Sequence, residues 1–400
     1  MQRGAISRYF AGAAAKILSA GEVDPRTSNQ HEFGGVVALK ALFGEEKQTI
    51  AAQFLFLTDD ENESTTANGF LTWYDARKNQ PHRAAEYRFY FPASPVIERA
   101  KPGDLLIIAK RGDGTALVLI APHGQSIGRH LLWLFDLPAP SDKFNATLFD
   151  GTEPHLNFAA NRLLETIGID TDIPVAAESQ LDQIINRFGE GFPTTAEFSK
   201  FARETAERTS PVEDPDATIV IWLEHEEGLF RVLERHLVEQ WLKSGKIDVD
   251  EFLRFSLSVH NRRKSRAGYA AENHLEAIFT SHDLKFSRTA KTEGKSRPDF
   301  LFPGHAEYHN PTFPTDKLAM LGVKTTCKDR WRQVLTEANR IAAKHLFTIE
   351  PGISADQTSE MQERDVQLVV PAALFDTFEA GQRGWLWNLN DFINHAKNLS

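Results

Sequence analysis

The chain has 400 residues, of which 41% are hydrophobic and 25% are charged, and this composition is typical of a globular protein with two or three domains. Its formal net charge of −10 argues against a protein that binds nucleic acid over its whole surface. Because the sequence has neither an apolar run long enough to span a bilayer nor a signal-peptide h-region at its N-terminus, we expect a cytoplasmic protein that does not contact a membrane.

Residues 1–137 predict a β-rich domain. Short runs of β-branched and aromatic residues are typical of strands, and turn sequences such as the one over residues 101–104 separate them. Many short strands within about 130 residues indicate a barrel or a sandwich. The expected strands lie at residues 36–43, 49–57, 69–76, 87–93, 104–110, 115–121 and 130–137.

The residues after this point have helical patterns. We expect residues 138–190 to form a linker or helical segment and residues 191–400 to form a second domain. Thr194 or Thr195 is placed to cap one helix, and Asp248 and Asp250 favour the start of another. Residues 219–245 read as a pair of helices. The other expected helices lie at residues 157–168, 180–189, 194–208, 247–265 and 268–283.

From Leu284 onward, strand and helix patterns alternate, which predicts a mixed α/β core. Residues 329–344 have the spacing of a helix, and residues 378–398 are expected to close the domain with another helix. The expected strands lie at residues 285–290, 299–303, 318–326, 345–349 and 365–371.

Asp299, Lys324 and Glu337 are candidates for a cation-and-phosphate site within this core. Asp299 opens an apolar run, Lys324 closes the next one, and Glu337 follows thirteen residues later. Carboxylates hold hard divalent cations such as Mg²⁺, and a neighbouring lysine orients water or stabilises a phosphate transition state. On spacing alone the simpler interpretation is favoured: a turn aspartate, a surface lysine and a solvent-facing glutamate.

The residues between Lys324 and Glu337 shift this balance. In a helix, Arg330 and Glu337 share a face because they are seven residues apart. Arginine pairs with guanine through two hydrogen bonds, and aspartate accepts from the amine of cytosine. The run Lys328-Asp329-Arg330 is therefore a candidate reader of G·C pairs. The single cysteine, Cys327, excludes an internal disulfide, and we expect a packed residue there rather than a reactive thiol.

Basic residues are concentrated just before this site. Between His260 and Pro298 there are nine lysines and arginines against four acidic residues. An acidic protein with one basic region fits an enzyme that binds a polyanion in one place.

Residues 256–279, 291–303, 321–341 and 345–354 together resemble the catalytic domain of the EcoRII-type restriction endonucleases, and the run KTTCKDRWRQ is the most specific part of the resemblance. The resemblance implies a PD-(D/E)XK nuclease fold and Mg²⁺-dependent cleavage of double-stranded DNA at a CCWGG-like sequence, where W is A or T. It implies that Asp299, Lys324 and Glu337 are catalytic, with Asp299 and Glu337 as metal ligands. It also implies that Lys328, Asp329 and Arg330 read C·G pairs.

The resemblance gives roles to further residues. The usual carboxylate two positions before Lys324 is replaced by Gly322, and EcoRII-type enzymes take it from the following helix, where Glu337 stands. Glu272 also has a counterpart in the family, and either reaches the metal site through water, holds Lys324, or is a structural acid. Arg262, Arg263 and Lys264 are candidate phosphate contacts. The alternative for this run is a solvated basic loop.

Residues 1–137 resemble the B3-like DNA-binding pseudobarrel of the same family. The resemblance implies DNA contacts from two arms, and several basic residues cluster around one strand turn. The alternative is a surface hairpin with ordinary charges. The candidate contacts are Lys16, His31, Arg77, Lys78, Arg83, Glu86 and Arg88.

We therefore expect a multidomain α+β protein: an N-terminal B3-like β pseudobarrel, a linker, and a C-terminal α/β restriction-endonuclease-like domain with a helical subregion. The expected function is a type II restriction endonuclease that uses Mg²⁺ and binds two copies of its site on double-stranded DNA, as a homodimer or a monomer. The alternatives are a sequence-specific DNA-binding regulator with a silent nuclease core, and a repair or nicking nuclease.

Overall fold

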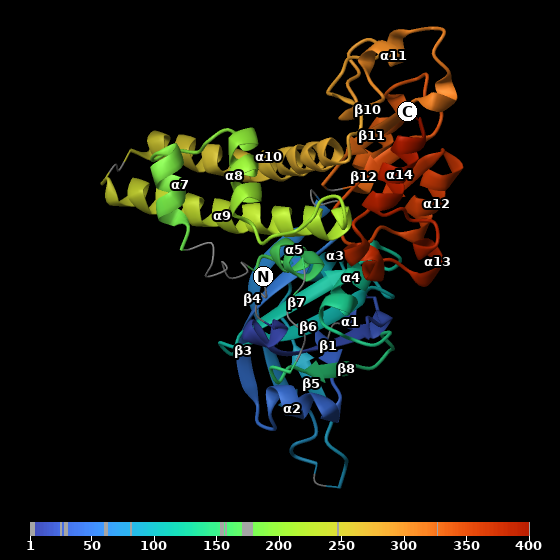
Figure 1. Cartoon of the computed structure of the whole chain (residues 1–400). Coiled ribbons are helices and arrows are strands. Elements are labelled where there is room, and N and C mark those ends of the chain that lie inside the picture. Colours follow the sequence, from blue (N-terminus) through green and yellow to red (C-terminus); the bar gives the residue numbers. More distant parts are fainter. Residues whose placement is uncertain are drawn as a thin grey trace. The chain divides into compact units, whose positions relative to one another are not determined.

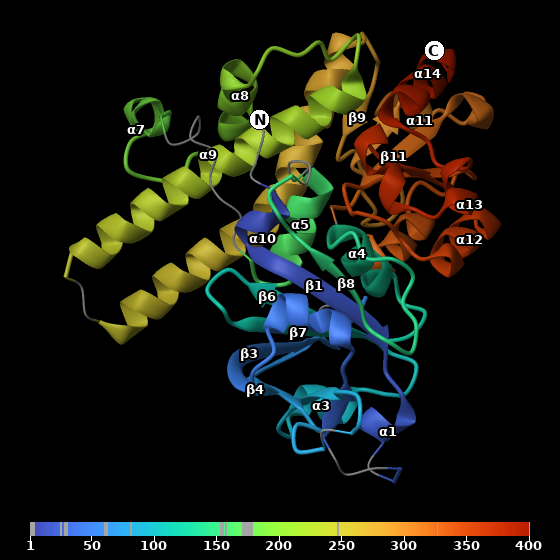
Figure 2. The ribbon, with the colours of Figure 1, turned by 90° about the horizontal axis from the view of Figure 1, so that it is seen from below.

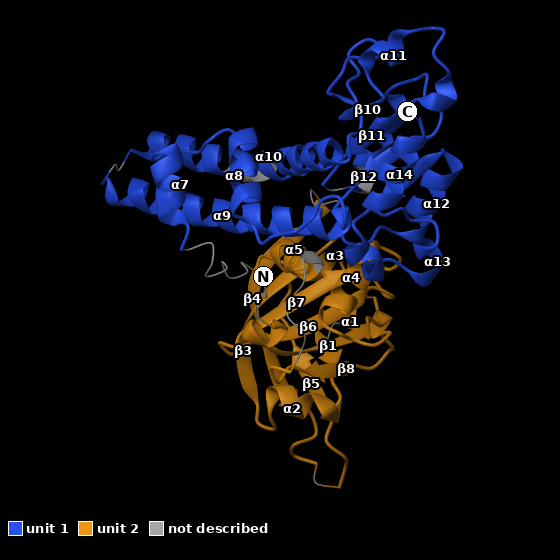
Figure 3. Ribbon diagram, viewed as in Figure 1, with its two compact units in different colours: residues 1, 172–400 blue, residues 2–171 orange. Residues whose placement is uncertain are grey.

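The computed structural model describes residues 5–24, 26–27, 31–59, 63–80, 82–152, 156, 158–169, 179–245, 248–325 and 327–399. Of residues 158, 159, 162, 260, 263, 264, 328 and 329 it describes the backbone and not the side chain. The chain folds into two compact units, residues 2–171 and residues 172–400 (Figure 3). None of the helices in the described ranges is both long and apolar enough to cross a membrane.

The first unit is built on an eight-stranded sheet with the order β2-β5-β4-β3-β7-β6-β1-β8 (Figure 1). Its neighbouring strands pair antiparallel, except that β3 and β7 pair parallel. The strands are β1 (Phe10–Ile17), β2 (Glu32–Gly34), β3 (Gln48–Phe56), β4 (Thr65–Asp75), β5 (Tyr87–Tyr90), β6 (Leu105–Arg111), β7 (Ala116–Ala121) and β8 (Asn145–Leu148).

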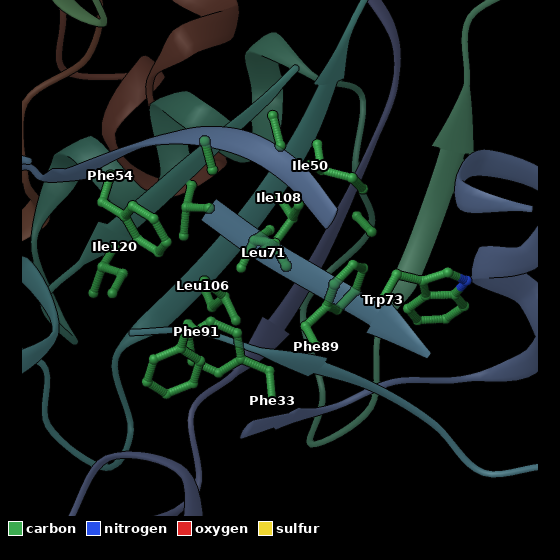
Figure 4. Close-up of a cluster of buried hydrophobic side chains, with 14 of the residues drawn as sticks. Phe33, Ile50, Phe54, Leu71, Trp73, Phe89, Phe91, Leu106, Ile108 and Ile120 are labelled. Carbon is green, nitrogen blue, oxygen red and sulfur yellow. The ribbon is translucent and has the colours of Figure 1, made fainter. Parts of the chain in front are cut away.

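The central strands of this sheet are apolar on both faces, so each face has its own core. In β6, Leu106 and Ile108 belong to one cluster, which Figure 4 shows with Trp73, Phe89 and other large side chains. Leu105 and Ile107 point into the second cluster. The short helices α1 (Ala20–Val23), α2 (Lys40–Phe43), α3 (Pro95–Arg99), α4 (Ser126–Leu134) and α5 (Phe158–Thr166) and the 3₁₀ helices η1 (Ile6–Arg8) and η2 (Val37–Leu39) complete the unit.

Five of the seven strands expected here are confirmed, and two are wrong. Residues 36–43 form η2 and α2, in which Leu39, Leu42 and Phe43 are buried at helical spacing. Residues 130–137 fall mostly in α4. The sheet also continues past residue 137, because β8 pairs with β1 and side chains of α5 join the second core. The unit therefore ends near residue 171 rather than at residue 137.

The second unit begins with a helical arm. It consists of α7 (Leu181–Phe188), α8 (Thr195–Thr205) and two long helices, α9 (Pro215–Lys243) and α10 (Val249–Ser281), which lie side by side (Figure 2). Thr194 caps α8 in a capping box with Glu197, and Asp248 caps α10, as expected.

The arm differs from the expectation in its continuity. Residues 219–245 lie in one helix and not in a pair, and the two helices expected over 247–265 and 268–283 are one helix of 33 residues. The basic run at residues 261–266 is rich in good helix formers, and Gly268 costs only about 1 kcal/mol in a helix interior. The run is therefore helical and not a loop.

The rest of the second unit surrounds a five-stranded sheet with the order β13-β12-β11-β10-β9. Strands β11, β12 and β13 are parallel, and β9, β10 and β11 are antiparallel. The elements are β9 (Ser287–Arg288), β10 (Phe300–Phe302), α11 (His305–His309), η4 (Thr315–Lys317), β11 (Ala319–Val323), η5 (Lys328–Thr336), β12 (Lys344–Phe347), α12 (Ala355–Glu363), β13 (Val366–Val369), η6 (Ala372–Thr377), α13 (Ala380–Arg383) and α14 (Leu389–Leu399).

The expected strands of this unit are all present, but the helix expected over residues 329–344 is wrong. Those residues form the 3₁₀ helix η5 up to Thr336, and then a turn in which Ala338 has a φ of 49°. A left-handed residue interrupts any right-handed helix. The two architectures together give a mixed α/β chain with one large and one small sheet.

Candidate active site

Asp299 and Lys324 lie together at one end of an antiparallel pair of strands, where β10 begins and β11 ends. Asp299 immediately precedes β10 and Lys324 immediately follows β11, and these strands pair with Phe300 opposite Leu321. Lys324 Nζ lies 3.1 Å from Asp299 Oδ2, and both side chains are largely buried. The Val323 amide donates to the same carboxylate oxygen at 2.6 Å. The carboxylate is therefore held by two donors from the adjacent strand.

Glu337 follows η5 and lies close enough to this pair to interact with both of its charges. Burial raises the pKa of Glu337 to about 7, while the positive charge of Lys324 lowers it and the negative charge of Asp299 raises it again. Its Oε2 atom is buried and has no hydrogen-bond partner among the described residues. The structure therefore brings together Asp299, Lys324 and Glu337, and leaves one carboxylate oxygen able to take a ligand.

Glu272 flanks the same site from α10. Its Oε2 accepts from Arg288 Nη2 at 2.9 Å, and Arg288 Nη1 donates to Glu276 at 2.7 Å and to Asn273 at 2.8 Å. Burial raises the pKa of Glu272, and the Arg288 hydrogen bond lowers it. Glu272 thus holds Arg288 and not Lys324. Arg288 was not among the expected site residues. In the sequence it stands between the acidic residues Glu272 and Glu276 of a predicted helix and Asp299, and this position is the signal that could have identified it.

Gly322 has a steric reason for lacking a side chain. A β-carbon at this position would lie 2.7 Å from Val334 Cγ1, which is closer than real contacts allow. Val334 is buried in η5, directly in the chain segment that leads to Glu337. The carboxylate that usually stands at position 322 would therefore clash with the segment that supplies Glu337.

The expected base-reading run lies at the start of η5. Arg330 is exposed, whereas the side chains of Lys328 and Asp329 lie outside the described part of the chain. Cys327 and Trp331 are fully buried, which agrees with a packed cysteine. The expectation that Arg330 and Glu337 share a helical face is wrong, because a 3₁₀ helix has three residues per turn and Glu337 lies beyond its end.

The described side chains of the basic run in α10 (residues 261–266) make contacts within the helical arm. Arg262 Nη1 donates to Pro193 O at 2.9 Å, and its guanidinium lies 4.8 Å from the centroid of the Phe192 ring. Arg266 is 6% exposed and pairs with Glu227. The side chains of Arg263 and Lys264 are not described. Arg262 would have to leave these contacts to reach a phosphate.

Three of the candidate DNA contacts of the first unit, Arg77, Glu86 and Arg88, are joined to one another by ion pairs. Arg77 pairs with Glu86, which also lies 2.5 Å from Arg88 Nη2. Arg88 Nη1 in turn lies 2.5 Å from Glu32 Oε2. The arginines lower the pKa of Glu86. Lys78 pairs with Glu46 at 3.1 Å.

The remaining candidates of this unit differ in exposure. His31 and Arg83 are exposed. Lys16 is only 4% exposed, and its Nζ lies 2.7 Å from Glu22 Oε1. Lys16 is therefore placed as a buried structural cation, and the expectation of a direct DNA contact does not fit this geometry.

Metal-binding potential at the site rests on two carboxylates. Over the described ranges, no group of three or more histidine, cysteine, aspartate or glutamate side chains is close enough to hold a metal ion. Asp299 and Glu337 provide the oxygen donors that hard cations prefer, and the unpartnered Glu337 Oε2 is suited to such a ligand.

Comparisons with known proteins find relatives of the region that contains the candidate site. The family model described as EcoRII C terminal matches residues 230–393. The chain is 43% identical over 209 residues to the type II restriction enzyme EcoRII of Escherichia coli, and the match covers 52% of this chain and 51% of that enzyme. The aligned part thus spans about half the length of the curated relative.

Two solved structures are similar at low identity. Metal-depleted Ecl18kI in complex with uncleaved DNA is 18% identical, with 57% of this chain and 84% of that chain covered and a TM-score of 0.44. The PspGI–substrate DNA complex is 12% identical, with coverages of 56% and 92% and a TM-score of 0.41. The family match at residues 230–393 contains Glu272, Asp299, Lys324 and Glu337, so the part of the chain that carries the candidate site is similar to the EcoRII C-terminal family.

Proposed function

We propose that the chain is a type II site-specific deoxyribonuclease that hydrolyses double-stranded DNA at a CCWGG-like sequence. The observation that carries this proposal is the convergence of Asp299, Lys324 and Glu337, within the segment that matches the EcoRII C terminal family model. An acidic pair beside a buried lysine suits phosphodiester hydrolysis, in which negative charge builds up on the phosphate.

Asp299 and Glu337 would hold a Mg²⁺ ion. Mg²⁺ is often bound by one or two carboxylates together with water and substrate phosphate oxygens, so two protein ligands suffice. Bound there, Mg²⁺ supplies Lewis-acid chemistry, which lowers the pKa of water and neutralises charge on the phosphate. The raised pKa of Glu337 agrees with a carboxylate whose charge needs a positive partner.

Lys324 supplies a positive charge that does not depend on the metal. Its ammonium is held 3.1 Å from Asp299 Oδ2, which leaves further N–H donors for the attacking water or a phosphate oxygen. Glu272 and Arg288 form a half-buried ion pair near Asp299 and would help to orient the site. Val323 and Thr289 fix Asp299 through its carboxylate and its main chain, at 2.6 and 3.0 Å.

Sequence recognition is assigned to the start of η5. Arg330 is exposed there, and with Lys328 and Asp329 it would contact the outer C·G pairs of the site. The first unit, as a B3-like domain, would bind a second copy of the same sequence and regulate cleavage. Among its candidate contacts, His31, Lys78 and Arg83 have exposed side chains, whereas Lys16 is buried.

Digestion of defined plasmids tests the proposal. The full-length chain with Mg²⁺ should produce fragments with uniform ends, and EDTA should abolish them. Sequencing of the ends, for plasmids with one site and with two sites, gives the cut position and the dependence on a second site. Asp299→Asn is the matched inactive control. Specific binding without cleavage would instead indicate a silent regulator, and cutting of one strand a nicking enzyme.

The same digestion addresses the oligomeric state. Two active sites acting together, as in a homodimer, cut both strands in one binding event. A monomer that acts twice accumulates nicked circles first. The nicked fraction at early times therefore separates these two arrangements.

A further inference from the structure

Lys344 is a buried lysine that contacts the main chain of the candidate metal ligand. It lies at the start of β12, is 5% exposed, and was not among the residues expected in the site. Its Nζ donates to Glu337 O at 2.5 Å and to Ala338 O at 2.7 Å. Among the described residues, no carboxylate lies within ion-pair distance of this ammonium. Burying an unpaired ammonium is costly, so a lysine here requires a reason.

The main chain at Glu337 is in an unusual conformation. Ala338 has a φ of 49°, in a region that alanine rarely adopts, and its side chain is fully buried. Such conformations cost about 1–3 kcal/mol and persist only where surrounding contacts enforce them. The two hydrogen bonds from Lys344 go to the carbonyl groups of the two peptide units that flank the Ala338 α-carbon.

Other contacts fix the same turn from different directions. The Glu337 amide donates to Val334 O at 3.1 Å, and the Ile341 amide donates to Ala338 O at 2.9 Å. The Asn339 amide donates to Glu293 Oε2 at 3.2 Å. In contrast, Glu337 Oε2 has no hydrogen-bond partner in the described structure. The direction of the Glu337 carboxylate is therefore set mainly through its main chain.

We propose that Lys344 is a positioning residue of the candidate active site: its buried ammonium holds the Glu337 main chain so that the Glu337 carboxylate faces Asp299 and Lys324. This inference rests on the proposed function, because it assigns a role relative to the same metal and phosphate site. Lys344 itself touches neither substrate nor metal. Residues that orient ligands in this way typically affect metal affinity or activity about 10–100-fold when they are changed.

The test compares Lys344→Met with two other variants in the full-length chain. Methionine has a similar length and no donor, so both hydrogen bonds are lost while the space stays filled. Lys344→Arg keeps donors. Arg340→Met is the matched control, because the Arg340 guanidinium donates to the carbonyls of Tyr308, Asn310 and Phe313 in the same region and not to those of Glu337 or Ala338. The measurements are the thermal unfolding midpoint, Mn²⁺ affinity by calorimetry, and single-turnover cleavage against Mg²⁺ concentration.

For Lys344→Met we expect Mn²⁺ affinity to fall and the Mg²⁺ midpoint to rise by roughly tenfold or more. Metal-free DNA affinity should stay within about threefold of the wild type, because the substitution removes only hydrogen bonds to the main-chain carbonyls of Glu337 and Ala338. Lys344→Arg should recover part of the loss. Arg340→Met should lower the unfolding midpoint without moving the metal dependence.

Two results would overturn the inference. One is a Lys344→Met protein with wild-type Mn²⁺ affinity and Mg²⁺ midpoint. The other is an equal change in metal dependence for Arg340→Met at the same loss of thermal stability. If Lys344→Met does not fold, Lys344→Gln takes its place, since its shorter amide cannot reach both carbonyls. A wild-type chain that binds Mn²⁺ at Asp299 but cleaves no DNA refutes the proposed nuclease, while Mn²⁺ affinity still decides the role of Lys344.

Discussion

Val334 fills the space that a side chain on residue 322 would need. A β-carbon built on Gly322 lies 2.7 Å from Val334 Cγ1, and both residues are buried between β11 and η5. Because β11 leads to Lys324 and η5 leads to Glu337, this contact sets how closely the two segments approach. Gly322 is thus part of the architecture that lets Glu337 enter the site.

Gly322→Ala should push η5 away from β11. We expect the free energy of unfolding to fall by about 1–3 kcal/mol, as for other overpacked cores. Urea unfolding measures the change, and cleavage should fall with it. In the double variant with Val334→Ala the removed methyl groups make room for the added one, so the two losses should not add. Additivity within about 0.5 kcal/mol would show that the two residues are not coupled.

Lys324→Ala should abolish cutting while leaving DNA binding measurable. The lysine stabilises charge that develops during the reaction, and losing one such group commonly costs about 10²–10³ in rate. Single-turnover cleavage and a metal-free binding assay give the two quantities separately. Lys317→Ala is the control, since Lys317 is exposed and donates to Asn398 O at the end of α14. Retained cutting by Lys324→Ala would exclude Lys324 from the catalytic set.

Arg330→Ala should relax sequence discrimination at one guanine. A bidentate arginine–guanine contact contributes about 1–3 kcal/mol of discrimination. Cleavage or binding of a set of single-base variants of the site measures the loss position by position. Arg332→Ala is a near neighbour for comparison, because Arg332 pairs with Glu360 at 2.6 Å. An unchanged discrimination profile for Arg330→Ala means that Arg330 does not read a base.

The parts of the structure that were predictable follow from local patterns. The short apolar runs over residues 104–110 and 115–121 identify β6 and β7, and strand ends at Asp299 and Lys324 were visible as the limits of apolar runs. Residues 130–137 are nearly all apolar, so their periodicity does not separate a strand from the helix α4 that they form.

Other features depend on contacts that are distant in sequence. The left-handed turn at Ala338 ends the helical pattern after η5, and it is held by Lys344 and Glu293, which no local rule connects to Glu337. Likewise, Lys16 is basic and near a predicted arm, but its pairing with Glu22 inside the core removes it from the surface. Charge type is readable from the sequence, whereas the partner of each charge is not.

His225 gives a prediction about pH and stability. It is 2% exposed in α9, where its Nε2 lies 3.0 Å from Thr205 Oγ1 and the buried Glu226 and His274 are its neighbours. Burial lowers the pKa of His225 from 6.5 to about 4, so the folded chain binds its proton less readily than the unfolded chain. The contribution of neutral His225 to the free energy of unfolding is fully present above pH 6.5 and is lost as the pH falls towards 4. Between these two pH values the loss in free energy of unfolding amounts to roughly 3 kcal/mol.

Replacing this histidine should flatten the pH dependence. His274 and His345 also have lowered pKa values through burial, so the His225→Gln protein keeps part of the slope and the difference between the two proteins is the relevant quantity. We expect His225→Gln, which can still pair with Thr205, to lose less free energy of unfolding than the wild type between pH 7 and pH 4.5 by about 2–3 kcal/mol. His236→Gln, at a partly exposed position of the same helix, is the control for replacing a histidine. Parallel curves for wild type and His225→Gln would show that His225 takes up its proton equally in both states.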